Sequence, residues 1–359
     1  MKTIQAETSQ PQSYKKHYAL LDGLRGIAAL AVLIFHYMEI IITDFSKNFI
    51  AHGFLAVDFF FCLSGFVIAY AYDDRMDNMH LGSYFKQRIK RLHPMVILGT
   101  AIGLLAFLVD PFGDAFSKYN ILQLLVIFLC SALLIPYPTM EDRYFNNFGL
   151  NAPSWSLFWE YIANIVYALI LVRLSKKLLF AIAILSAGVL IHVAKSAGNL
   201  LGGWNGETFW HGGARVLFSF VMGMCIFRYQ FIIKNRLGFL PLSLLLFASF
   251  LVPFHDTYNW IVEPLIVIFY FPFLIALGAG SIVSANQEKY CTFSGNMSYP
   301  LYMTHYFVMW VFGAYYAKYQ PATVTLIGVI VITSLLQLMI AYLAMKYWDE
   351  PIRRKIKNW

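Results

Sequence analysis

The sequence has little charge and few cysteines. Charged residues make up 13% of its 359 residues and hydrophobic ones 59%, whereas a soluble domain is roughly half apolar and a quarter charged. The four cysteines, Cys62, Cys130, Cys225 and Cys291, show no paired spacing, so neither a disulfide framework nor a metal site is predicted. These shortages argue against a soluble enzyme or a small disulfide-bonded domain and indicate an integral membrane protein.

The sequence contains long apolar runs, separated by connections that carry most of its charged residues. Most of the runs reach the ~20 residues that a membrane-spanning helix needs, and none alternates as a barrel strand would. The first run contains charges and lacks a small-residue cleavage site, so we expect it to remain as a membrane helix. The eleven runs lie near residues 20–42, 53–72, 94–109, 121–136, 155–172, 178–194, 214–227, 238–254, 261–284, 298–317 and 323–347.

Basic residues gather in alternate connections between the runs. Of the 27 Lys and Arg residues, 20 precede the first run or follow the second, fifth, seventh, ninth and last, which places both termini in the cytoplasm. The net charge of +8 is therefore a topology signal, and no nucleic-acid partner is predicted. Eleven full spans would put the termini on opposite sides. One run between residues 94 and 152 must fail to cross, and 121–136, which ends at Pro136, is the candidate for a re-entrant segment.

The predicted fold is an all-α, polytopic transmembrane helix bundle with about ten spans, one possible re-entrant segment and cytoplasmic termini. We expect a cytoplasmic tail at residues 1–17, a transmembrane domain at 18–350 and a second cytoplasmic tail at 351–359. We expect the transmembrane domain to have membrane lipid as a binding partner. The residues leave the oligomeric state open.

The first run, LDGLRGIAALAVLIFHY, carries ionisable residues at membrane depth. Such groups are costly there and mark functional sites. Arg25 and His36 are eleven residues apart, which puts them on nearly one helix face and about 16 Å apart along the axis. Arg25 could equally pair with Asp22 at the boundary. Glu39 lies one turn beyond His36, where it could fix the tautomer of a general base; the alternative is an interfacial histidine that caps the helix.

Two further segments place charge where a partner is needed. Asp58 lies in a hydrocarbon-like run and requires a partner from another helix, either to orient a catalytic group or to tie two helices together. The segment SYFKQRIKRLHP presents Arg88 and Arg91 on one helical ridge before Pro94, which is expected to open the third span. Arginine forks suit phosphate oxygens, but the ridge could also bind anionic lipid or only set topology.

Residues for an acceptor are less distinct in the sequence. Glu160 lies about two turns into the fifth run, which opens with SWS around Trp155, and His305 lies inside the tenth run in SYPLYMTHYFV. A buried histidine is more often a packing residue than a catalyst. Trp204 and Trp210, in an external connection, could stack on sugar rings or belong to an interfacial aromatic belt.

Together, LDGLRGIAALAVLIFHY, FLAVDFFFCLSGFVIAY, RIKRLHP, SWSLFWEY and SYPLYMTHYFV resemble the acyltransferase 3 family of integral membrane acyltransferases. The resemblance runs from about residue 17 to the tail YWDEPIRRK. The family's first-helix arginine and histidine match Arg25 and His36, and its cytoplasmic arginine pair matches Arg88 and Arg91. Members commonly move acetyl from acetyl-CoA to hydroxyls of cell-surface polysaccharides, lipid-linked glycans or small molecules.

The resemblance implies roles for the residues singled out above. Arg88 and Arg91, with Arg25, would hold the phosphates of acetyl-CoA, the donor substrate. His36 would be the catalytic base or acyl relay, with Asp58 and Arg25 assisting it. Glu160, Trp155 and His305 would contact a glycan or lipid-linked sugar acceptor. In some relatives a further extracytoplasmic domain completes the transfer. This sequence ends soon after its last apolar run, so we expect it to acylate its acceptor directly or to pass the acyl group to a separate partner.

The sequence therefore predicts a membrane O-acyltransferase, most readily an acetyl-CoA-dependent O-acetyltransferase of the inner (plasma) membrane. One alternative is a proton-coupled transporter of a glycan or small molecule, which would also use buried Arg, His, Asp and Glu but would consume no thioester. A non-catalytic membrane scaffold is the other, and it would tolerate loss of His36.

Overall fold

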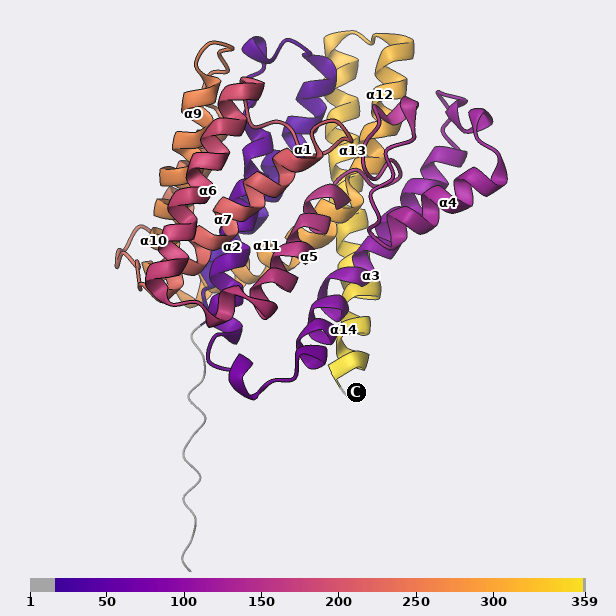
Figure 1. The fold of residues 1–359 in the computed structure, drawn as a ribbon. Helices are drawn as coiled ribbons and strands as arrows, with labels where there is room; N and C mark the ends of the chain where they lie inside the picture. The colour runs from indigo at the N-terminus through magenta and orange to yellow at the C-terminus, as the bar shows by residue number, and fades with distance from the viewer. Residues whose placement is uncertain (1–16, 358–359) are drawn as a thin grey trace, which may run out of the picture.

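The computed structural model describes residues 17–357, and every regular element in that range is a helix. Figure 1 shows the helices packed side by side in one bundle, with the start of α1 (Ala19–Ile41) and the last helix, α14 (Glu350–Lys357), at the same end. Only isolated β-bridges occur in the described residues. The all-α class is thus confirmed, while most of the predicted tail at residues 1–17 lies outside the description.

Seven segments of the described chain are long and apolar enough to cross a membrane, and the protein is a multi-pass membrane protein. The seven comprise α1, the run η2 (Gly53–Leu55) and α2 (Ala56–Tyr72), α3 (Leu81–Leu108), α6 (Lys176–Ala197), α7 (Phe209–Arg228), the run α9 (Asn259–Leu265), η7 (Ile266–Tyr270) and α10 (Phe271–Gly280), and the run α13 (Thr323–Ala344), η8 (Met345–Asp349) and the first part of α14. The remaining α-helices are α4 (Ile121–Ala132), α5 (Ser154–Leu169), α8 (Phe239–Phe250), α11 (Ala285–Thr304) and α12 (Tyr306–Tyr319).

The start of α3 corrects the sequence prediction. Pro94 was expected to open the third span, but α3 begins at Leu81 and continues through Pro94. The first turns are rich in Lys, Arg and Gln, which favour helix although they are not apolar. Arg88 and Arg91 therefore belong to the same rigid helix as the membrane span.

Small residues bring two helix pairs into close contact. Packing, rather than water exclusion, holds helices together in lipid, so interfaces favour small residues. A Cβ added to Gly26 of α1 would collide with Ser294 of α11, and one added to Gly65 of α2 would collide with the backbone of Phe220 in α7. α2 and α7 thus make their close approach at Gly65.

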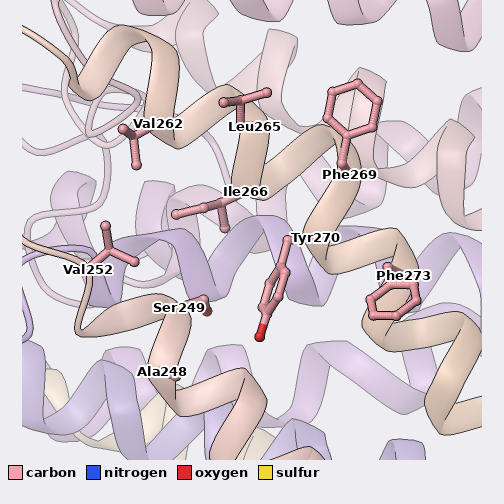
Figure 2. A pocket seen from close by; sticks show the side chains of 9 residues that line it. All are labelled: Ala248, Ser249, Val252, Val262, Leu265, Ile266, Phe269, Tyr270 and Phe273. Carbon is pink, nitrogen blue, oxygen red and sulfur yellow. The ribbon is translucent and has the colours of Figure 1, made fainter.

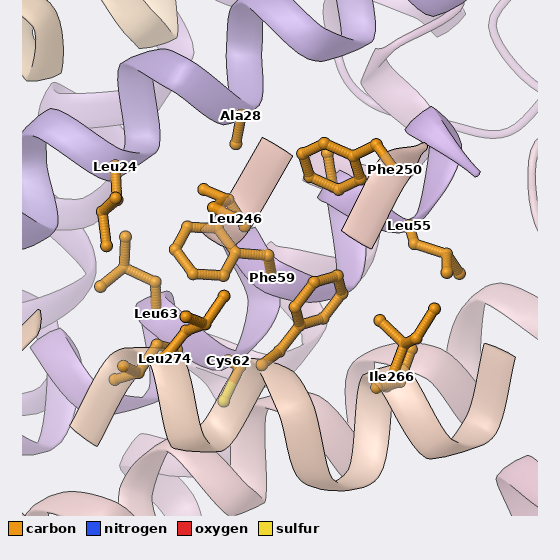
Figure 3. Close-up of a cluster of buried hydrophobic side chains, with 14 of the residues drawn as sticks. Leu24, Ala28, Leu55, Phe59, Cys62, Leu63, Leu246, Phe250, Ile266 and Leu274 are labelled. Atoms are coloured by element: carbon orange, nitrogen blue, oxygen red, sulfur yellow. The ribbon is translucent and has the colours of Figure 1, made fainter. Parts of the chain in front are cut away.

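An apolar core fills the space between α1, α2, α8 and α10. Figure 3 shows Leu24 of α1, Phe59 of α2, Leu246 of α8 and Leu274 of α10 pointing toward one another. All four side chains are fully buried. This core fixes α1 from one side while α11 fixes it from the other, so the functional face of α1 has a rigid support.

Candidate active site

Four guanidinium groups lie together at the end of the bundle where α1 begins. We call Arg25, Arg88, Arg91 and Arg353 the arginine cluster. Arg91 is exposed, yet Arg25, Arg88 and Arg353 all lie near enough for their charges to act on it. The structure thus brings together the three arginines that the sequence singled out. Neighbouring positive charges repel one another and create a strong positive potential. Such a cluster therefore attracts a polyanion from solution.

Other helices hold two members of the arginine cluster in place. Arg25 donates to Ser298 Oγ at 2.8 Å and to the Gly295 carbonyl at 2.7 Å, both on α11, and its NH2 lies 3.3 Å from Asp22 Oδ1. Arg88 is 6% exposed and lies 3.3 Å from Glu160 Oε1, which also accepts from Ser64 Oγ. Glu160 therefore contacts the arginine cluster, and the acceptor role predicted for it stays a prediction.

His36 lies toward the opposite end of α1 and is oriented by a carboxylate. Its Nδ1 is 2.5 Å from Glu39 Oε1. Toward an ionised carboxylate, Nδ1 of a neutral imidazole acts as the donor, and in that tautomer Nε2 carries the lone pair that can accept a proton or attack a carbonyl. The carboxylate partner that the sequence placed one turn beyond His36 is present.

A second histidine stacks on His36. The ring of His305 lies at the break between α11 and α12, with its centroid 5.3 Å from that of His36 and an interplanar angle of 24°. His305 Nδ1 is 2.9 Å from the Tyr302 carbonyl, while its buried Nε2 has no hydrogen-bond partner among the described residues. Beside it, Tyr302 and Ser156 share a 2.8 Å hydroxyl contact. His305 thus presents an unused polar atom next to His36.

A row of aromatic rings continues from His36 along α12. Tyr306 packs edge-on against His36 at 4.7 Å between centroids, and Trp310 lies 5.1 Å from Tyr306. The guanidinium of Arg143 lies 4.4 Å over Trp310, and Tyr144, which is 69% exposed, stacks on the same ring. Sequence reasoning missed this row: Tyr306 and Trp310 follow His305 on α12 without a motif that marks them, and Arg143 and Tyr144 come from a distant segment.

Asp58 is paired away from His36. Arg215 NH2 lies 2.6 Å from Asp58 Oδ2, and the same guanidinium donates to the carbonyls of Phe54 and Gly202. Trp155 packs over Arg215 at 5.2 Å. Neither Asp58 nor Trp155 has a recorded contact with His36, so the catalytic role predicted for Asp58 and the substrate role predicted for Trp155 both stay predictions.

Another buried polar pair lies in the same half of the bundle. His52 and Glu263 are both fully buried, with Nε2 of the histidine 3.3 Å from Oε1 of the carboxylate. The Leu200 amide donates to the other carboxylate oxygen, and His52 Nδ1 is 2.8 Å from the Val252 carbonyl. These bonds tie α9 to two connections of the chain. No local pattern predicts this pair, because His52 and Glu263 are 211 positions apart.

An apolar cleft lies elsewhere on the bundle. Its volume is about 820 Å³, and Figure 2 shows it between α8 and the run from α9 to α10, with Ser249, Val262, Phe269 and Phe273 among its walls. None of the site residues lines it. A smaller groove of about 580 Å³ beside α11 carries Glu288 and Glu350 against one lysine, Lys289, so it does not suit a polyanion.

The fold and the site define a class: helical membrane proteins that present a cationic cluster at one end of a helix and a carboxylate-held histidine toward the other. Comparison with known proteins is more specific. The acyltransferase domain model of the acyltransferase 3 family matches residues 18–343. The chain belongs to this family and carries its acyltransferase domain.

Curated relatives agree with the family. The chain is 33% identical to "Protein 2 in picA locus" of Rhizobium radiobacter over 51% of this chain and 97% of that protein. It is 24% identical to O-acetyltransferase OatA of Staphylococcus aureus strain NCTC 8325 over 93% of this chain and 57% of the relative. A putative O-acetyltransferase of S. aureus strain COL is 26% identical over 94% of this chain and 58% of the relative. The chain thus spans somewhat over half the length of these O-acetyltransferases. No solved structure matches it.

Proposed function

We propose that the chain transfers an acyl group, most readily acetyl, from cytoplasmic acyl-CoA to a sugar hydroxyl of a cell-surface polysaccharide or lipid-linked glycan. The observation that carries the proposal is the layout of α1, which contributes Arg25 to the arginine cluster and holds the His36 and Glu39 pair some 16 Å further along the axis. One rigid element thereby links an anion site to a general base. The relatives named as O-acetyltransferases support the acetyl group.

The proposed topology has ten spans and cytoplasmic termini in the inner (plasma) membrane. The spans are the seven long segments together with α5, α8 and the bent pair of α11 and α12. α4 and α8 have 12 residues each, about 18 Å of helix and shorter than a spanning helix needs. We assign α4 as the segment that does not cross, because it lies between residues 94 and 152, where the distribution of basic residues requires one run to stay on its side. The placement of the start of α1 and of α14 at one end of the bundle supports this count, because an even number of crossings returns the chain to its starting side (Figure 1).

In this topology the arginine cluster faces the cytoplasm, where coenzyme A is found. The nucleotide end of coenzyme A carries several phosphates, and the guanidinium group of arginine binds phosphate oxygens in a bidentate manner. The exposed guanidinium of Arg91 makes the first contact, and the buried Arg88 is preoriented by Glu160. The thioester end of the donor would then point into the bundle toward His36.

Two routes for the acyl group are compatible with His36. In direct transfer, Nε2 takes the proton of the acceptor hydroxyl, the oxygen attacks the thioester carbonyl, the carbon–sulfur bond breaks, and the proton passes to the leaving CoA thiolate. In a relay, Nε2 itself attacks the carbonyl and expels CoA thiolate. The acceptor oxygen then attacks the acyl carbon, the bond to Nε2 breaks, and Nε2 takes the hydroxyl proton, which it later gives up to the thiolate or to solvent. Glu39 stabilises the positive charge that His36 acquires in either route.

The aromatic row suits a sugar acceptor. Apolar faces of pyranose rings pack on aromatic side chains, and the exposed ring of Tyr144 offers such a face at the outer part of the row. Trp310 Nε1 is buried without a partner among the described residues, as is His305 Nε2 next to His36. We place the acceptor along Tyr144, Trp310 and His305, with its hydroxyl at His36.

The test is release of free CoA thiol from acetyl-CoA by the purified protein in nanodiscs, with a mixture of candidate glycans added. Wild-type protein is expected to consume the thioester. The Arg88→Ala/Arg91→Ala variant is expected to raise the donor KM at least about tenfold, because each lost guanidinium removes a charge-assisted hydrogen bond. A folded wild type that neither binds nor consumes acetyl-CoA or longer acyl-CoAs overturns the donor assignment.

A further inference from the structure

The C-terminal segment returns to the arginine cluster. α13 continues through the π-helical turn η8 directly into α14. Trp348 in η8 donates from Nε1 to the Pro94 carbonyl at 2.8 Å, and Pro94 lies three residues beyond Arg91 on α3. α14 is thereby fixed beside the helix that carries Arg88 and Arg91. π-helical turns inside α-helices occur frequently at functional sites.

Two neighbouring arginines of α14 differ sharply in their surroundings. Arg353 NH2 lies 2.6 Å from Oδ2 of Asp349, which is 2% exposed, and Arg353 Nε is buried with no hydrogen-bond partner among the described residues. The Arg353 side chain is 32% exposed and its charge acts on Arg91 and on Tyr299. Arg354 is 80% exposed and pairs only with the partly exposed Glu350. Arg353 therefore faces the cluster, and Arg354 faces solvent.

The charges of the cluster are not fully matched. Asp22 lies against Arg25, Glu160 against Arg88 and Asp349 against Arg353, but no ion pair is recorded for Arg91 among the described residues. Within the described part of the chain, the guanidinium of Arg353 has a nitrogen, Nε, without a hydrogen-bond partner, and it lies near Arg91, which has no ion pair there. Two such arginines can bind one phosphate between them. α14 thus contributes Arg353 Nε as a further hydrogen-bond donor for an anionic ligand of the arginine cluster.

We propose that Arg353 is a binding residue for a phosphate of the nucleotide part of the donor, so that α14 forms one wall of the donor site. This rests on the proposed function and adds a residue from outside the segment that the family model matches. Asp349 acts as a positioning residue, because its buried carboxylate orients the guanidinium.

The experiment measures CoA affinity of the full chain in nanodiscs by titration calorimetry, for wild type, Arg353→Ala and the matched control Arg354→Ala. Arg353→Ala is expected to weaken CoA binding at least about tenfold, as loss of a charge-assisted hydrogen bond does. Arg354→Ala is expected to stay within about twofold, because exposed ion pairs contribute little. Equal affinity in wild type and Arg353→Ala overturns the proposal.

A second readout separates phosphate binding from a general loss of structure. S-acetylpantetheine is a thioester that lacks the nucleotide and its phosphates, so its slow turnover should be equal in wild type and Arg353→Ala while the KM for acetyl-CoA rises. An equal fall with both donors shows a merely structural role and overturns the proposal. If wild type binds no CoA, the donor assignment itself fails. If wild type binds CoA and Arg353→Ala binds it as tightly, only the role of Arg353 fails.

Discussion

The buried pair of Asp58 and Arg215 is expected to dominate the stability of the α2 and α7 interface. Arg215 is 1% exposed and Asp58 fully buried. The Arg215→Met variant keeps an apolar chain of similar length but leaves the carboxylate without its cation. It also removes the donors to the carbonyls of Phe54 and Gly202.

Leaving one partner of a buried ion pair uncompensated costs about 3–5 kcal/mol. A change of that size corresponds to a fall in melting temperature on the order of 10 °C for a domain of a few hundred residues. Asp58→Leu/Arg215→Met removes both charges and should recover most of the loss, since no charge is then left unpaired. Arg236→Met, at an exposed position in the connection before α8, is the matched control and should melt as wild type does.

The assay is thermal unfolding in detergent, followed by intrinsic fluorescence, together with acetyl-CoA turnover of each variant at a temperature where it is folded. A double variant that melts as low as Arg215→Met refutes the reasoning from charge pairing. Its activity also decides the role of Asp58: turnover near wild type identifies a structural residue, and a stable but inactive double variant supports the catalytic role predicted from the sequence.

Three further outcomes follow from the site and its packing. Glu39→Gln is expected to lower kcat at least about tenfold with little change in donor KM, because His36 loses the partner that fixes its tautomer; an unchanged kcat in steady-state kinetics contradicts this role. Glu160→Gln should raise the donor KM severalfold by releasing Arg88, whereas a change confined to the acceptor KM would restore the acceptor role predicted from the sequence. Gly65→Val should destabilise the protein by about 1–3 kcal/mol, since the Cβ of the new valine meets backbone of α7 that cannot move aside. In the melting assay, a wild-type melting temperature for this variant would show that α2 and α7 can separate without loss of stability.

Much of α1 could be predicted because its signals are local. The spacing of Arg25 and His36 and the position of Glu39 follow from helix geometry alone, and the structure places Arg25 in the arginine cluster and Glu39 on His36. Apolar runs located most membrane helices for the same reason. They misplaced the start of α3, because its first turns are helical through propensity rather than hydrophobicity.

Contacts between distant segments could not be read from the sequence. Asp58 pairs with Arg215, 157 positions away, and His305 stacks on His36, 269 positions away. The sequence showed that Asp58 needed a partner from another helix, yet periodicity places a residue only on a face of its own helix. Which helix lies opposite is decided by close packing at small residues such as Gly26 and Gly65, and the sequence does not show which surface each of them meets.

The proposed transfer depends on His36 as the base or relay. The most direct measurement is single-turnover release of CoA from labelled acetyl-CoA in nanodiscs, comparing wild type with His36→Ala and with the matched control His192→Ala on the exposed face of α6. If His36 performs the transfer, His36→Ala should bind CoA as tightly as wild type but form free CoA from acetyl-CoA at least about a hundredfold more slowly, while His192→Ala should behave as wild type. A folded His36→Ala variant that turns over at the wild-type rate would exclude His36 as the catalytic group.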